Sequence, residues 1–297
     1  MDKIQTNSVK AWVLAARPKT LTGAAVPVCI ALSQAWVDRG ATLLWWPALL
    51  CLGFAFLMQI NANLINDYFD FAHGIDREDR LGPERACAQG WITPRAMKGG
   101  IALTIVLSAL VGLPLVWWGG WEMVGVGAFC MVFSFLYTTL LSRRAMGDVL
   151  VLLFFGIVPV CATYFIQVGQ VSLPTFLLSV GCGLATDNLL IVNNFRDRET
   201  DARHGKLTLV TLLGERVSLC LYLLLAVVAA ALAFYVLIDS GRPAWACALP
   251  LLYLLAVLRV WWMMKRIWRG RELNRVLGLT SLTILLYGLV LCVGILL

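Results

Sequence analysis

Two pairs of aspartates are the residues of this chain best suited to chemistry. Asp67 and Asp70 are three positions apart, and Asp197 and Asp201 are four positions apart. On a helix, either spacing places both carboxylates on one face, about one turn apart, where they repel each other unless a cation lies between them. Oxygen ligands favour a hard ion, and Mg²⁺ commonly binds one or two carboxylates together with substrate phosphates. The pairs therefore predict a magnesium site for a diphosphate.

Neutral and basic residues near the pairs extend this prediction. Asn63 and Asn193 lie one turn before the first aspartate of each pair, and Asn66 lies beside Asp67. Their amide oxygens can complete a metal site or orient the carboxylates. Basic side chains would neutralise phosphate oxygens, Arg through bidentate contacts and Lys as a point charge. The candidates on the same face are Arg17, Lys19, Arg143, Arg144, Arg196 and Lys206.

Other acids call for separate interpretations. Beyond Asp70, four acids alternate with Arg77, Arg80 and Arg85, a pattern typical of loop salt bridges; they are Asp76, Glu78, Asp79 and Glu84, of which only Asp76 joins the candidate site. Asp148 and Asp187 instead lie within apolar segments, Asp187 about 15 Å of helix rise before Asp197. A charge at such depth usually faces a cavity or a partner. Asp187 is therefore expected to line an acceptor pocket or to pair with a neighbouring helix.

Long uncharged segments must position these residues. The 297 residues are 60% hydrophobic and 14% charged, whereas soluble domains are about 45–50% apolar and about 25% charged. A membrane helix needs ~20 apolar residues, a length that Val217 to Ile238 provides. We expect an all-α integral membrane bundle of nine transmembrane helices around a central cavity, over residues 20–38, 42–66, 96–118, 121–141, 147–168, 173–194, 217–238, 243–264 and 275–297.

The distribution of lysine and arginine predicts the orientation, because cationic residues near helix ends are retained in the cytoplasm. With the amino terminus inside, only Arg39 and Arg242 of the 24 basic residues fall in outer loops. The amino terminus and the site face are thus expected to be cytoplasmic, and the carboxyl terminus outside, in a plasma or inner membrane. The net charge of +7 reflects this topology and attraction to membrane lipid, and requires no nucleic acid. The nine dispersed cysteines show no CxxC spacing, so neither a disulfide framework nor a zinc site is expected.

The two aspartate segments also resemble each other. Residues 63–76 and 193–206 each open with Asn-x3-Asp, contain a further aspartate, and continue with x2-His-Gly, at His73-Gly74 and His204-Gly205. Membrane bundles are often built from repeated halves with the site between them. We therefore interpret residues 1–297 as a single membrane-embedded domain in which two pseudo-repeated halves each contribute one motif.

With these residues in place, the sequence resembles the UbiA superfamily of membrane aromatic prenyltransferases. It is most similar to the branch that contains the 1,4-dihydroxy-2-naphthoate polyprenyltransferases of menaquinone biosynthesis. Asp76, six residues beyond Asp70, favours this branch, because ubiquinone-type members usually place an acid four residues on, where this chain has Gly74. The resemblance is carried by AARPKTL (15–21), NDYFDFAHGIDREDRLGPERA (66–86), MGDVLVLLFFG (146–156) and NNFRDRETDARHGKLTL (193–209).

The resemblance implies Mg²⁺-dependent transfer of a polyprenyl group from polyprenyl diphosphate to an aromatic acceptor. For 1,4-dihydroxy-2-naphthoate, the transfer is accompanied by decarboxylation and gives demethylmenaquinone. It further implies that the four aspartates coordinate magnesium, supported by Asn63, Asn66 and Asn193, with basic residues at Arg17, Lys19, Arg196 and Lys206. A Tyr-Ser-x-x-Lys-Arg-like element of the superfamily is represented only by Tyr137, Arg143 and Arg144.

Two alternatives stay open at this point. The same reaction on 4-hydroxybenzoate or homogentisate would use the same motifs. An ion-coupled transporter would also contain intramembrane acids and paired halves, but its functional acids are expected near the middle of the bilayer. Here all the candidate acids except Asp187 cluster at one surface, which favours the enzyme.

Overall fold

The computed structural model describes residues 4–74, 81–141 and 144–297. Within these residues, nine helical segments are long and apolar enough to cross a membrane, which confirms the predicted bundle. In chain order they are Val9–Asp38 (α1 Val9–Ala16, η1 Pro18–Thr20, α2 Leu21–Asp38), Trp45–Ala72 (α3), Pro94–Gly119 (α4 Pro94–Gly112, η2 Leu113–Leu115, α5 Val116–Gly119), Glu122–Thr139 (α6), Gly147–Val168 (α7 Gly147–Leu152, η4 Leu153–Ile157, α8 Val158–Val168), Leu173–Arg203 (α9), Glu215–Asp239 (α11), Ala244–Ile267 (α12 Ala244–Cys247, α13 Pro250–Ile267) and Leu273–Leu296 (α14). The short α10 (Leu209–Leu213) links the sixth and seventh segments.

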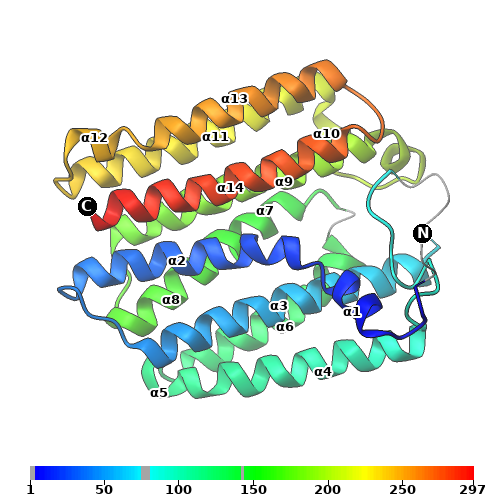
Figure 1. The fold of residues 1–297 in the computed structure, drawn as a ribbon, viewed down its shortest axis with the longest axis horizontal. Helices are drawn as coiled ribbons and strands as arrows, with labels where there is room; N and C mark the ends of the chain where they lie inside the picture. The colour runs from blue at the N-terminus through cyan, green and yellow to red at the C-terminus, as the bar shows by residue number, and fades with distance from the viewer. Residues whose placement is uncertain (1–3, 75–80, 142–143) are drawn as a thin grey trace.

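The helices lie side by side along one direction, so the bundle has two distinct ends (Figure 1). Both α3 and α9 run toward the end at which the amino terminus lies, and the carboxyl terminus lies at the other end. The polar carboxyl-terminal turns of α3 and α9 stay helical well past the apolar stretches, to Ala72 and Arg203. The aspartate pairs therefore sit on helices at the same end of the bundle.

The first membrane segment is broken at its motif-side end. Arg17 adopts a left-handed conformation with φ 52°, and Pro18 then begins η1. The Nδ2 atom of Asn63 on α3 donates hydrogen bonds to Ala16 O and Thr20 Oγ1, each 2.9 Å long. The amide of Asn63 thus fixes the corner that carries Arg17 and Lys19 against the first aspartate helix.

The carboxyl-terminal half packs closely around α9. Small side chains of α11, including Ala226, Ala229 and Ala233, are fully buried in a core shared with α9, α13 and α14. Small residues let membrane helices approach closely. Their association then depends on van der Waals packing, because within lipid the hydrophobic effect does not drive helices together. The close packing of this half therefore fixes the position of α9.

The π-helical turn η4 is also pressed against α9. A Cβ atom at Gly156 would lie 2.4 Å from Ser179 O and 2.7 Å from Gly183 Cα, so only glycine permits this approach. One at Gly183 would lie 2.9 Å from Leu152 O. Such turns inside α-helices often occur at functional sites. Here the glycine contact fixes the position of α7, and of Asp148 on it, relative to α9.

Candidate functional site

Asp67 holds the segment that follows the first motif. It is only 1% exposed. Its Oδ2 accepts a hydrogen bond from Ala86 N and its Oδ1 one from Cys87 N, each 2.8 Å long. The segment that begins at Leu81 is thereby folded back over the end of α3. In this conformation Asp67 anchors the loop, a role that its spacing from Asp70 does not reveal.

Asp70 is paired with an arginine from the same folded-back segment. The Nη2 atom of Arg85 lies 2.6 Å from Asp70 Oδ2, and the two side chains are 8% and 21% exposed. The sequence interpretation of Arg85 as part of a loop salt-bridge pattern is correct in that it forms an ion pair. It misses that the partner is Asp70, which makes Arg85 a residue of the site. The one local feature that indicates this pairing is the position of Arg85, directly before Ala86 and Cys87, whose backbone N–H groups bind Asp67.

In the second motif, Arg196 is the organising residue. Its side chain is 2% exposed. Its Nε and Nη2 atoms donate to the two oxygens of Asp197 at 2.8 and 2.6 Å, and Nη2 also donates to Asn193 Oδ1 at 2.9 Å. Asp201 is paired with Lys206, whose Nζ lies 3.1 Å from Asp201 Oδ2. Each aspartate of this motif is therefore neutralised by a nearby cation of the protein.

The two motifs are joined through Asn274 at the start of α14. Its Oδ1 accepts from Arg196 Nη1 at 2.8 Å, and its Nδ2 donates to Leu81 O at 2.8 Å. A Cβ atom at Gly82 would lie 2.8 Å from Arg196 Nη2, so the loop after the first motif rests on the second motif. Sequence reasoning missed Asn274, because nothing near it in the chain resembles a motif.

The predicted asparagines act mainly as positioning groups here. Asn66 Oδ1 accepts from Thr138 Oγ1 at 2.5 Å, which ties α3 to α6. Asn63 binds the corner after α1, and Asn193 binds Arg196. Asn63 and Asn66 also line a cavity. The structure thus brings all three to the site, with Asn63 and Asn66 engaged by other elements and Asn193 by Arg196 of its own helix.

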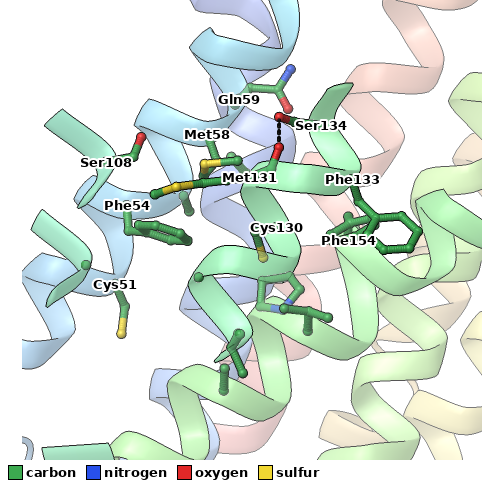
Figure 2. Close-up of a pocket in the computed structure, with 18 of the residues that line it drawn as sticks. Cys51, Phe54, Met58, Gln59, Ser108, Cys130, Met131, Phe133, Ser134 and Phe154 are labelled. Atoms are coloured by element: carbon green, nitrogen blue, oxygen red, sulfur yellow. Dashed lines mark hydrogen bonds between the residues drawn. The ribbon is translucent and has the colours of Figure 1, made fainter. Parts of the chain in front are cut away.

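An apolar cavity of about 450 Å³ begins at these asparagines. It runs between α2, α3, α4, α6 and the α7–α8 segment, and Figure 2 shows its wall of Phe54, Met58, Met131, Phe133 and Phe154. Polar groups concentrate at its motif end, at Gln59, Asn63, Asn66 and Tyr137. Tyr137 also lines a smaller polar pocket that contains Asn193 and Lys206. It therefore lies between the apolar cavity and the second motif.

The remaining candidates differ in their surroundings. Arg17 is half-buried at the α1–α2 corner, whereas Lys19 and Arg144 are exposed. The backbone of Arg144 pairs with Leu207, and Ala145 N donates to Leu207 O at 3.0 Å, so the loops after α6 and α9 meet. The predicted candidates Asp76 and Arg143 lie outside the described residues.

Both motifs end in the same cap. The Nδ1 atoms of His73 and His204 each lie 2.7 Å from the carbonyl oxygen four residues earlier, and Gly74 and Gly205 follow with φ of 63° and 67°. The histidines therefore sit at the ends of their helices, each with its Nδ1 atom engaged by the helix backbone. The matching caps agree with the pseudo-repeat, which stays a prediction.

The donor set fits a hard divalent cation. The helix ends that carry the two motifs lie at one end of the bundle, and Asn274 and Gly82 link them through Arg196. Oxygen atoms are the ligands that Mg²⁺ prefers. In the part of the chain that the structure describes, no three acidic, histidine or cysteine side chains form a ready-made metal cluster. Instead Arg85, Arg196 and Lys206 neutralise Asp70, Asp197 and Asp201. Metal binding at these carboxylates therefore requires those cations to turn away.

The fold and site define a class of protein: a helical integral membrane protein with twin acidic motifs at the mouth of an apolar cavity. The chain belongs to the UbiA prenyltransferase family, whose model matches residues 24–282. It is thus a membrane prenyltransferase.

Proteins of known function support this assignment. The chain is 34% identical over 282 residues, 94% of each chain, to the 1,4-dihydroxy-2-naphthoate octaprenyltransferase of Mycobacterium tuberculosis. It is 35% identical over 233 residues, 72% of each chain, to the enzyme of that name from Escherichia coli.

Solved structures share the fold. A UbiA homologue from Aeropyrum pernix, in its apo form, superposes with a TM-score of 0.71 at 17% identity, covering 92% of this chain and 97% of that one. A UbiA homologue from Archaeoglobus fulgidus, bound to GPP and Mg²⁺, gives a TM-score of 0.66 at 17% identity, covering 95% and 99%. At this identity the likeness concerns the fold alone.

Proposed function

We propose that the protein transfers a polyprenyl group from polyprenyl diphosphate to 1,4-dihydroxy-2-naphthoate in a magnesium-dependent reaction. The acceptor loses carbon dioxide, and the product is demethylmenaquinone in its reduced form. The observation that carries the proposal is that both acidic motifs meet at the polar mouth of a long apolar cavity. The names of the two similar octaprenyltransferases support the choice of acceptor.

The partly exposed carboxylates are the best placed to hold the metal. Asp70, Asp197 and Asp201 have side chains 21%, 23% and 13% exposed, whereas Asp67 is almost fully enclosed. Bound magnesium would supply charge neutralisation and Lewis-acid assistance as the allylic carbon–oxygen bond lengthens. Once released from the carboxylates, Arg85, Arg196 and Lys206 donate hydrogen bonds to the diphosphate oxygens, which stabilises the leaving group.

The cavity performs the second part of the task. Its aromatic and methionine walls accommodate the polyprenyl chain and keep water away from the allylic cation. The ring carbon that bears the carboxylate then attacks the allylic carbon of the prenyl group. A carbon–carbon bond forms between them as the allylic carbon–oxygen bond to diphosphate breaks. The bond between that ring carbon and its carboxylate then breaks, carbon dioxide leaves, and the electron pair of the bond returns to the ring and restores its aromaticity.

The orientation is part of the proposal. Arg39 and Arg242 follow α2 and α11 at the end of the bundle opposite the motifs. We assign the motif end and the amino terminus to the cytoplasm and the carboxyl terminus to the outside, because cationic residues are retained in the cytoplasm. In this orientation the site opens to the cytoplasm, and the soluble diphosphate leaving group would be released there.

Purified protein supplied with one polyprenyl diphosphate and each acceptor in turn tests the acceptor. The acceptors are 1,4-dihydroxy-2-naphthoate, 4-hydroxybenzoate and homogentisate, with the naphthoate labelled in its carboxyl group. We expect prenylation of the naphthoate, with one labelled carbon dioxide released per diphosphate. Preferential prenylation of 4-hydroxybenzoate or homogentisate would reassign the acceptor. Transport of a solute without diphosphate release would favour the transporter.

A further inference from the structure

Two buried acids have no part in the chemistry proposed so far. Asp148 on α7 is 8% exposed and Asp187 on α9 is 5% exposed. Neither oxygen of Asp148, nor Oδ1 of Asp187, has a hydrogen-bond partner among the residues that the structure describes. Burying a polar group without a hydrogen bond is destabilising, and burying a charged group is more so. Groups this costly call for a donor beyond those that the described residues provide.

These acids lie beside the site. Asp148 lines the small polar pocket of about 50 Å³, together with Tyr137, Asn193, Asn194, Lys206 and Thr208. Asp187 is close enough to Asp148 for their charges to interact, and both act on Tyr137. Tyr137 also lines the apolar cavity. Asp148 therefore lines the pocket that adjoins the apolar cavity and the second motif at Tyr137, and Asp187 lies near enough to interact with it.

The pocket is built to hold its carboxylate still. Gly147 packs so closely on α9 that a Cβ atom there would lie 3.1 Å from Leu190 Cδ2. The glycine contact between Gly156 and Gly183 fixes the same two helices a few turns further on. A preorganised polar group discriminates between ligands better than a mobile one. Asp148 is thus fixed in a pocket that has room for a polar substituent but is too small for an aromatic ring.

The cation already in this pocket is engaged elsewhere. Lys206 lines the pocket, but its Nζ forms an ion pair with Asp201 at 3.1 Å. The groups that face Asp148 from α6 and α9 are Tyr137, Asn193 and Asn194. Among the described residues Asp148 has no hydrogen-bond donor, and a phenolic hydroxyl on a ring lying beside Tyr137 would supply one.

We propose that Asp148, with Asp187 behind it, accepts a hydrogen bond from a hydroxyl group of the aromatic acceptor and so selects hydroxylated rings. This inference rests on the proposed function, because it assigns the acceptor end of the same site. The hydroxyl-bearing edge enters the polar pocket, and the body of the ring lies in the apolar cavity at Tyr137. Asp148 is then a specificity-determining residue.

Binding of naphthoates to wild-type and variant protein tests the proposal. The ligands are 1,4-dihydroxy-2-naphthoate, 1-hydroxy-2-naphthoate and 2-naphthoate, followed by their own fluorescence in detergent, with magnesium and a non-reacting prenyl diphosphate analogue present. Wild-type protein is expected to bind the dihydroxy compound at least roughly tenfold more tightly than 2-naphthoate, as a hydrogen bond to a charged group warrants. In Asp148→Leu this ratio is expected to fall to about one.

Further variants separate a binding role from a structural one. Asp148→Glu retains a carboxylate and is expected to retain part of the hydroxyl preference. Asp239→Asn, at an exposed position at the end of α11, is the matched control. In turnover, Asp148→Leu is expected to raise the KM for the acceptor and leave the KM for the prenyl diphosphate unchanged.

The possible outcomes distinguish this inference from the proposed function. If wild-type protein prenylates a hydroxylated ring but the binding ratio is the same in Asp148→Leu, the inference is overturned and the proposed function stands. If Asp148→Leu does not fold, the same ratio in Asp148→Ala, which removes the acceptor without adding bulk, decides: an undiminished preference in Asp148→Ala overturns the inference. If wild-type protein prenylates no hydroxylated ring, the proposed function fails first.

Discussion

Asp70→Asn is expected to lower prenyl transfer at least about a hundredfold while the protein stays folded, a loss typical of removing one preorganised electrostatic group. Asp70 is partly exposed, and Arg85 is the cation paired with it. The substitution removes the charge that we propose binds the metal, without opening a cavity in the core. Initial rates of diphosphate release at saturating magnesium measure the effect, with the melting temperature in detergent as the test of folding. Wild-type turnover would remove Asp70 from the site.

Asp67→Asn is the informative comparison for Asp70→Asn. Asp67 accepts two backbone N–H groups, and an asparagine side chain would turn an N–H₂ group toward one of those donors. We therefore expect Asp67→Asn to lose activity and also to lower the free energy of unfolding by about 1–3 kcal/mol. Equal melting temperatures for Asp67→Asn and Asp70→Asn would show that Asp67 does not anchor the loop.

Arg196→Gln is expected to produce the second large effect, on activity and stability together. The buried guanidinium joins Asp197, Asn193 and Asn274, and through Asn274 it reaches the loop after the first motif. Breaking a buried ion pair costs about 3–5 kcal/mol. Because Asp197 is 23% exposed and stays partly hydrated, we expect a loss near the lower end of that range.

Arg196→Lys should fall between wild type and Arg196→Gln, because a point charge cannot reproduce the directed contacts of the guanidinium. Arg271→Gln, at an exposed position close to Asn274, is the matched control. Thermal melting in detergent and initial rates measure both effects. If Arg196→Gln matched Arg271→Gln in both, Arg196 would not join the two motifs.

The fold, and the end of the bundle that carries the two acidic motifs, could be predicted from the sequence. Apolar segments long enough to cross a membrane give the nine helices directly, and the alternation of helix direction places α3 and α9 with their motif ends together. The predicted segments ended near residues 66 and 194, whereas α3 and α9 continue to Ala72 and Arg203. Hydropathy reports where a segment leaves the apolar part of the membrane, not where its helix ends. It therefore drops at the polar last turns of α3 and α9, which remain helical.

The partners within the site could not be predicted, because they depend on packing between distant parts of the chain. Arg85 reaches Asp70 only after the segment beyond Leu81 folds back, and Asn274 meets Arg196 across 78 positions. Asp67 and Asp70 look equivalent in their spacing, yet one anchors a loop and the other faces the site. Side-chain types indicate which chemistry is available, and tertiary contacts assign it to particular residues.

The central claim is that both acidic motifs together hold a divalent cation on a prenyl diphosphate. Binding of a non-hydrolysable prenyl thiodiphosphate to purified protein, titrated with magnesium, tests it most directly. We expect saturable binding that requires magnesium, disappears in EDTA, returns when magnesium is restored, and is lost in Asp70→Asn and in Asp197→Asn separately. Undiminished binding in EDTA, or in either variant, would contradict it.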